Sequence, residues 1–330
     1  MTWLLAQIGS KPYGSPMYTV GDMQSAGMSC RVCGSDRVKF WRKRTLDRRL
    51  VPNDLRITDS RYGVTLSLWR CDHCDFVQAD GDEIPELFEL YSELDDPTYE
   101  SGRETRKLQM QWLLERGLGA LPTAGTLLDV GAGTGLMVIE AKEKKLKAVG
   151  VEPSHSLVAA GRTQNGLSDS ELVQGTIPNP ALDGQVFDLV CLIDVIEHVA
   201  DPVAFLRSAA ERLSVGGLCI VVTPDVSSAT ARALGKRWWH FRLAHVGYFD
   251  RHSMELAARS AGLSVTQSFR AKWFFSVNYL ADRVAVYLPP VNKLNQIAAS
   301  KPVLRRLYQR IIPLNLHDSL VFFLDKRAAA

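Results

Sequence analysis

The chain has 330 residues, of which 46% are hydrophobic and 23% are charged, and its formal net charge is +3. These are values of a globular protein, and the length leaves room for one α/β domain and a small additional module. No apolar run reaches the ~18 residues that a membrane-spanning helix needs. The first residues lack the basic start and apolar length of a secretory signal. A cytoplasmic location with reduced thiols is therefore expected.

The N-terminal part of the chain predicts a metal-binding module. Residues 1–27 mix Gly, Ser, Met and Pro without periodicity, so we expect them to be disordered. Residues 28–80 hold two C-x-x-C pairs, and two such pairs can direct four thiolates at one tetrahedral metal. Structural zinc is favoured over disulfides, which a cytoplasmic chain disfavours, and over a thioredoxin-like site, because neither pair follows a βαβ pattern. The expected ligands are Cys30, Cys33, Cys71 and Cys74.

Residues 81–122 are expected to form lid or linker helices. The stretch from Ile84 to Tyr99 is acidic and aromatic. Residues 103–117 have apolar side chains at a helical period. Gly117 and Gly119 are candidates for the end of this helix.

The most informative stretch is residues 126–135, in which an apolar run reaches Asp129 and three glycines then alternate with small residues. This pattern predicts a strand, a tight turn and the start of a helix whose unpaired N–H groups face the turn. A second predicted strand ends in Glu152, 21 residues after Gly131, about where a βαβ unit places a carboxylate for ribose hydroxyls. The third glycine comes one residue too early for a dinucleotide fold, and Asp129 would repel a diphosphate. S-adenosylmethionine, which is cationic and has no phosphate, tolerates both carboxylates.

Four segments of the chain resemble motifs of the class I S-adenosylmethionine-dependent methyltransferases of type 11/23. Residues 128–135 resemble motif I and residues 150–154 the second motif. Residues 187–202 resemble the fourth strand with its exit loop, and residues 213–224 the turn into the fifth strand. Their order, over roughly 100 residues, argues against chance agreement.

The resemblance implies an α/β fold over residues 123–330, a Rossmann-like seven-stranded methyltransferase sheet with helices on both faces. The N-terminal module would then be a small zinc-ribbon-like addition. Cys191 and Cys219 fall inside predicted core strands and are expected to be buried hydrophobes. The loops at the strand ends are expected to bind the cofactor. They contribute Asp129, Gly131, Ala132, Gly133, Gly135, Glu152, Pro153, Gly175, Thr176, Ile177 and Asp194.

The acceptor chemistry is expected to involve a turn after the fourth strand. Asp194, Glu197 and His198 share one face of a helical turn there, and His245 comes from a segment expected to close over the same end of the sheet. In one arrangement His198 or His245 is the catalytic base. In another, both histidines and Glu197 hold a divalent ion such as Mg²⁺, which lowers the pKa of an acceptor hydroxyl. This second arrangement resembles a metal-dependent subset of the family. A third reading gives this turn only a structural role.

An insertion at about residues 272–315 separates the last two predicted strands, residues 263–269 and 318–324. We expect an amphipathic helix pair that covers the acceptor site, with peripheral contact to a membrane as the alternative. Residues 230–312 carry 14 Lys/Arg against 3 acids, which favours an anionic partner.

The sequence thus predicts an enzyme that methylates a small-molecule, sugar or lipid-linked acceptor. O-methylation in a glycan or natural-product pathway is the expected reaction. Two alternatives are a nucleic-acid (RNA) methyltransferase, suggested by the zinc module and the basic C-terminal half, and a scaffold that binds the cofactor without turnover.

Overall fold

The computed structural model describes residues 28–48, 50–55, 62–85, 87, 90, 99–288, 290–291, 295 and 301–326. Residues 1–27, which are expected to be disordered, lie outside these ranges. So does most of the expected lid segment from Ile84 to Tyr99.

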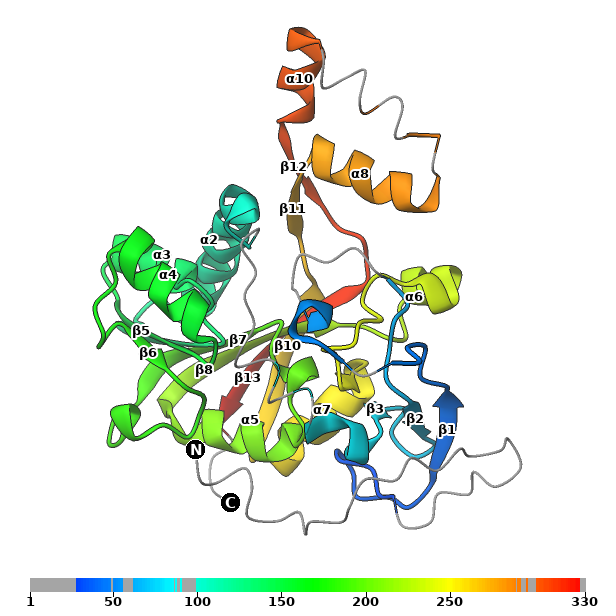
Figure 1. Cartoon of the computed structure of the whole chain (residues 1–330). Helices are drawn as coiled ribbons and strands as arrows, with labels where there is room; N and C mark the ends of the chain where they lie inside the picture. The colour runs from blue at the N-terminus through cyan, green and yellow to red at the C-terminus, as the bar shows by residue number, and fades with distance from the viewer. Residues whose placement is uncertain are drawn as a thin grey trace.

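Within the described ranges, the main sheet has seven strands in the order β10-β13-β8-β7-β4-β5-β6 (Figure 1). The strands from β4 to β8 run parallel, whereas β13 is antiparallel to both of its neighbours. This is the Rossmann-like methyltransferase fold that the sequence predicts. The strands are β4 Thr126–Val130, β5 Lys147–Glu152, β6 Leu172–Gln174, β7 Phe187–Ile193, β8 Leu213–Pro224, β10 Leu263–Arg270 and β13 Ser319–Lys326.

Helices cover both faces of this sheet. On one face lie α2 Arg103–Ala120, α3 Leu136–Glu143 and α4 His155–Asn165; on the other lie α5 Pro202–Glu211 and α7 Arg251–Ser260. Side chains alternate along each strand, so Cys191 of β7 packs with the α2 side and Val190 with the α5 side. Cys191 and Cys219 are fully buried, as expected. Side chains of Ser154 and Asp201 cap α4 and α5.

Helix α2 extends beyond the glycines that were expected to end it. Gly117 is buried inside the helix, and a Cβ placed there would lie 2.6 Å from Cδ1 of Ile220. Gly119 is exposed and a Cβ there would meet nothing within 4 Å. The first glycine therefore allows the helix to approach the sheet closely, and the helix continues to Ala120.

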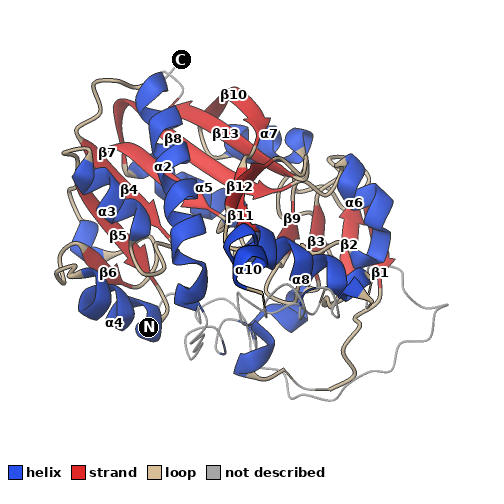
Figure 2. Ribbon diagram, turned by 90° about the horizontal axis from the view of Figure 1, so that it is seen from above, coloured by secondary structure: helices blue, strands red, loops and turns tan. Residues whose placement is uncertain are grey.

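A second sheet joins the N-terminal module to the rest of the protein. Its order is β1-β2-β3-β9, with β1 Val38–Arg42, β2 Leu68–Cys71, β3 Val77–Ala79 and β9 Gly247–Tyr248. Because β9 comes from the chain after β8, the sheet is not confined to residues 28–80 (Figure 2). The Arg31 guanidinium adds to this connection by donating to the carbonyl oxygens of Ala79, Ala200 and Val246.

The insertion before β13 contains a two-stranded ribbon that the sequence did not predict. β11 Trp273–Ser276 pairs with β12 Ile311–Leu314, and the helices α8 Val277–Tyr287 and α10 Pro302–Tyr308 lie between them in the chain. These elements project from the sheet (Figure 1). The short helix α6 Ala229–Leu234 follows β8. No helix in the part of the chain that the structure describes is both long and apolar enough to span a membrane.

Candidate functional site

The glycine loop after β4 has the backbone geometry that its sequence predicts. Gly131, Gly133 and Gly135 have φ angles of 77°, 54° and 81°, values that side-chain-bearing residues rarely adopt. Space is also restricted at two of them. A Cβ on Gly131 would lie 2.4 Å from Val195, and one on Gly135 would lie 2.2 Å from Leu167. The loop therefore requires glycine for both conformation and packing.

Glu152 lies at the end of β5 and faces this loop. Its Oε2 accepts a hydrogen bond from the Gly133 N–H at 2.9 Å, and its Oε1 accepts one from the Ser154 N–H at 2.8 Å. Burial raises the pKa of Glu152 to about 7. Burial, followed by the charge of Glu152, also raises the pKa of Asp129 to about 7. Two carboxyl groups thus lie at neighbouring strand ends in a buried environment that favours a positive ligand charge.

The other expected cofactor residues follow the same edge of the sheet. Ala132 donates its N–H to the carbonyl of Val151, and the Gly175 N–H donates to the carbonyl of Glu152 at 2.9 Å. Pro153 follows β5, and Gly175, Thr176 and Ile177 follow β6. The carboxyl ends of β4, β5 and β6 therefore bring together the loops that the sequence singled out.

Asp194 lies at the carboxyl end of β7 with a φ of 52°. Its N–H donates to the carbonyl of Val222 at 3.0 Å, and its Oδ1 has no hydrogen-bond partner among the described residues. Burial, followed by the charge of Asp318, raises the pKa of Asp194 to about 7. This carboxyl group is accordingly well placed to receive a cationic or hydrogen-bonding ligand.

The structure brings Glu197, His198 and His245 together. Each offers a ligand atom within 4.8 Å of the others, and the two imidazole rings are perpendicular with centroids 4.8 Å apart. Oε2 of Glu197 accepts from the Thr223 hydroxyl at 3.1 Å. Oε1 of Glu197 and Nδ1 of His245 are buried and have no hydrogen-bond partner in the described ranges. Both atoms are therefore free to bind a ligand or a water molecule, and burying an unpaired polar group is costly.

Both of these histidines are neutral near pH 7. Burial lowers the pKa of His198 to about 4 and that of His245 well below its usual value. Nδ1 of His198 lies 2.9 Å from the carbonyl oxygen of Ala244, which can only accept, so Nδ1 carries the proton and Nε2 the lone pair. Neutral imidazoles are metal ligands, but a depressed pKa makes them weak proton acceptors.

A further histidine–carboxylate pair, missed in the sequence, lies beside this cluster. Nε2 of His240 is 3.3 Å from Oδ2 of Asp318, and the Trp238 indole donates to the same oxygen at 3.3 Å. The ring of His240 stacks on His245 with centroids 6.2 Å apart. The His240 side chain is 21% exposed, whereas that of Asp318 is 1% exposed. The sequence predicts only a strand at Asp318, and the two residues lie 78 positions apart, so no local spacing indicates that they form a pair.

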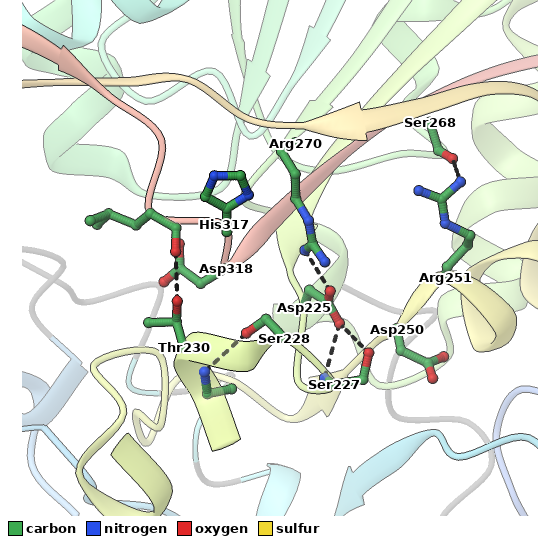
Figure 3. A network of polar contacts seen from close by, with 12 residues as sticks. Asp225, Ser227, Ser228, Thr230, Asp250, Arg251, Ser268, Arg270, His317 and Asp318 are labelled. Carbon is green, nitrogen blue, oxygen red and sulfur yellow. Dashed lines mark hydrogen bonds and ion pairs between the residues drawn. The ribbon is translucent and has the colours of Figure 1, made fainter. Parts of the chain in front are cut away.

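A polar network fixes the strand ends around Asp318 (Figure 3). The Arg270 guanidinium contacts Oδ2 of Asp225 at 2.5 Å, and Oδ1 of Asp225 accepts from the N–H and hydroxyl of Ser227. The Thr230 hydroxyl donates to the carbonyl of Leu316 at 2.6 Å. These contacts tie the residue after β8 to the end of β10, and helix α6 to the chain entering β13.

The four N-terminal cysteines converge from the two turns of the module. Their sulfur atoms all lie within 4.8 Å of one another, with 3.5 Å between Cys30 and Cys74 and 3.6 Å between Cys33 and Cys71. These separations exceed the ~2.05 Å of a disulfide. They are close to the ~3.8 Å between sulfurs of a tetrahedral site with 2.3 Å zinc–sulfur bonds. The donor set therefore fits zinc.

This fold, with glycine loop and acidic strand ends, defines a class I S-adenosylmethionine-dependent methyltransferase. Residues 102–268, half of the chain, match the family model described as a methyltransferase domain. The chain therefore belongs to this methyltransferase family.

Similar proteins include O-methyltransferases. A ubiquinone biosynthesis O-methyltransferase of Bradyrhizobium diazoefficiens is 32% identical over 136 residues, 40% of this chain and 50% of that protein. Another with the same name, from Azorhizobium caulinodans, is 35% identical over 99 residues, 29% of this chain and 39% of that protein. The chain thus spans about half, or less, of the length of the curated relatives it matches.

Solved structures of methyltransferases resemble the chain at low identity. The CcbJ methyltransferase of Streptomyces caelestis has a TM-score of 0.45 and 14% identity, with 71% of this chain and all of that chain covered. The O-methyltransferase NcsB1 from neocarzinostatin biosynthesis, solved with S-adenosylmethionine, has a TM-score of 0.39 and 15% identity, with 67% and 56% covered.

Proposed function

We propose that this enzyme O-methylates a hydroxyl group of a small-molecule, sugar or lipid-linked acceptor in a glycan or natural-product pathway. The observation that carries the proposal is the group of histidine and carboxylate side chains at the carboxyl ends of β7 and β8, next to the loops expected to hold the cofactor. Methylation of a hydroxyl requires loss of its proton, and this group offers two ways to achieve it. The O-methyltransferase relatives support the same reaction class.

Glu152 and the glycine loop would hold the cofactor. Each Glu152 oxygen accepts one backbone N–H, and a carboxylate oxygen has two lone pairs, so each can also accept from one ribose hydroxyl. Asp129 and Asp194 would provide negative charge near the amino and sulfonium groups. S-adenosylmethionine supplies the methyl group, which an acceptor oxygen attacks in line with the departing sulfur.

His240 is the best-suited proton acceptor. Because Nε2 faces Asp318, its Nδ1 would carry the lone pair when Nε2 is protonated, and the carboxylate would stabilise the imidazolium that forms. The His240 side chain is partly exposed and gives an acceptor access that the buried His245 lacks, and the lowered pKa of His198 makes that imidazole a weaker proton acceptor. We therefore give the base role to His240 and treat His198 and His245 as candidate metal ligands.

Glu197, His198 and His245 would hold a divalent ion such as Mg²⁺. The buried, unpartnered Oε1 of Glu197 and Nδ1 of His245 support this assignment. When bound, such an ion would bind an acceptor oxygen and lower the pKa of its hydroxyl.

The test is transfer of labelled methyl from S-adenosylmethionine to a panel of hydroxylated sugars, lipid-linked sugars and phenols. On an accepted substrate, His240→Gln and Asp318→Asn should lower kcat by at least tenfold with little change in KM, and the loss should diminish at high pH. If activity falls after EDTA and returns with Mg²⁺ or Mn²⁺, the ion assignment stands. Full activity of the His240 and Asp318 variants would contradict the assignment of His240 as the base. Activity that EDTA leaves unchanged would contradict the assignment of a divalent ion to this site.

The four cysteines would hold a structural Zn²⁺. One equivalent should copurify with the protein and be lost from Cys33→Ser, whereas Cys191→Ser should retain it. Equal metal content in both variants would contradict the zinc assignment.

A further inference from the structure

The described elements β11, α8, α10 and β12, which fall between residues 273 and 314, form an arm that projects from the main sheet (Figure 1). Nine large apolar side chains are exposed in the described part of the chain, and six of them lie in this arm. They are Tyr279, Val284, Val286, Leu288, Leu307 and Ile312, with exposed fractions from 37% to 58%. Exposed apolar side chains concentrated in one part of a protein indicate a site of interaction with a protein, a membrane or a ligand.

The arm is also strongly basic. Residues 273–314 contain six Lys/Arg residues and one acid, Asp282, whose carboxylate accepts from the side chains of Asn278 and Asn295. The exposed residues Arg305 and Arg306 of α10 form no ion pair within the described ranges. The positive charge of the arm is therefore available to an anionic partner.

We propose that this arm docks on the surface of an anionic lipid bilayer. Helices with exposed apolar side chains and basic residues bind at the boundary between headgroups and acyl chains. There, burial of the apolar side chains and attraction of the basic residues to anionic headgroups both stabilise the bound state. A second copy of the arm fits less well, since two basic surfaces repel each other. RNA phosphates would pair with the arginines, but RNA would not bury exposed aliphatic side chains such as Val284 and Leu288.

The root of the arm lies at the candidate acceptor site. The Ala271 N–H, just before β11, donates to the carbonyl of Ser319 at 3.1 Å, the residue after Asp318. At its other end, the arm continues from β12 to Leu316, which Thr230 holds. Docking would therefore bring the strand ends towards the bilayer, which suits an acceptor with a lipid portion. This last step rests on the proposed function, whereas docking itself does not.

Sedimentation of the full chain with sucrose-loaded vesicles tests the proposal without any methyl acceptor. The chain should bind vesicles of phosphatidylcholine with a quarter phosphatidylglycerol at least tenfold more tightly than pure phosphatidylcholine vesicles, and less tightly as NaCl is raised. Arg305→Glu/Arg306→Glu should reduce binding at least tenfold, because each basic residue near the surface contributes about fivefold. Lys147→Glu/Arg259→Glu makes the same change in charge at exposed positions outside the arm and should bind like the wild type.

The apolar contribution is tested separately with Val284→Ser/Leu288→Ser, which should bind several-fold more weakly at constant charge. Since all these side chains are exposed, circular dichroism and S-adenosylmethionine affinity should stay unchanged and report intact folding. No binding by the wild type, or equal losses in the arm and control variants, would overturn the proposal. So would binding to poly-U RNA that exceeds vesicle binding, or a dimer in light scattering that the arm variants disrupt.

Discussion

Two buried carboxyl groups, Asp129 and Glu152, lie at the strand ends where we propose that the cofactor binds. In the ligand-free protein, burial holds both pKa values near 7, so each group is partly protonated at neutral pH. A permanently cationic ligand would favour the ionised forms and lower both pKa values. At the proposed site, the cofactor and the proton would therefore compete for the same carboxylates.

This competition predicts a pH dependence. Since these pKa values are higher in the folded protein than in the unfolded chain, their contribution to stability is lost as pH rises from about 4 towards 7. S-adenosylmethionine should offset that loss, and its affinity should rise between pH 6 and pH 8. Isothermal titration calorimetry across this pH range measures the affinity for S-adenosylmethionine. An affinity independent of pH would show that neither carboxyl group changes its charge on binding.

Glu152 itself can be tested with Glu152→Gln. The amide keeps one acceptor oxygen but turns an NH₂ group towards a backbone N–H or a ribose hydroxyl, and it loses a charge-assisted hydrogen bond worth about 1.5–3 kcal/mol. We expect S-adenosylmethionine to bind at least tenfold more weakly. Glu143→Gln, on the exposed side of α3, is the matched control, and equal affinities of the two variants would remove Glu152 from the site.

At the scale of elements, helix α2 offers a pair of glycines with opposite expected responses. Gly119→Ala should raise stability by about 0.5 kcal/mol, since alanine favours the helix and no atom obstructs its Cβ. Gly117→Ala gains the same propensity but presses its Cβ against Ile220, and overpacking costs about 1–3 kcal/mol. Thermal unfolding should show a higher Tm for the first variant and a lower Tm for the second. A rise in both would mean that α2 shifts without cost.

Local sequence patterns predicted the elements that local interactions define. The glycine loop and the two cysteine turns each depend on residues that are close in the chain, so spacing reveals them. The pair of His240 and Asp318 joins residues 78 positions apart, and the β11–β12 ribbon pairs strands across the insertion. Such contacts leave no periodicity in the sequence. The sequence likewise predicts a helix end at Gly117, because the contact that explains this glycine is with Ile220, in a strand distant along the chain.

Arg31 links the cysteine module to the candidate catalytic cluster. It donates to the carbonyls of Ala200 and Val246, which follow His198 and His245 closely in the chain. The module therefore holds the two histidine-bearing segments together.

This arrangement predicts that Arg31→Lys lowers methyl transfer. Lysine keeps the charge but cannot reach three carbonyl groups at once. We expect kcat to fall about tenfold while S-adenosylmethionine affinity, which depends on β4 and β5, stays unchanged. Arg37→Lys, an exposed position in the same module, provides the comparison. If Arg31→Lys and Arg37→Lys behave alike, the module does not position the histidines.

The pairing of β3 with β9 also has a consequence for biosynthesis. Val77 pairs with Tyr248, so 171 residues separate the two strands in the chain. At about 5–20 residues per second, a ribosome takes roughly 10–30 s to add them. Throughout that interval the N-terminal sheet has an open edge, although its four cysteines have already been made. This sheet can therefore be completed only after β9 has been synthesised, and a chaperone or an early-bound metal ion would have this interval in which to protect its open edge.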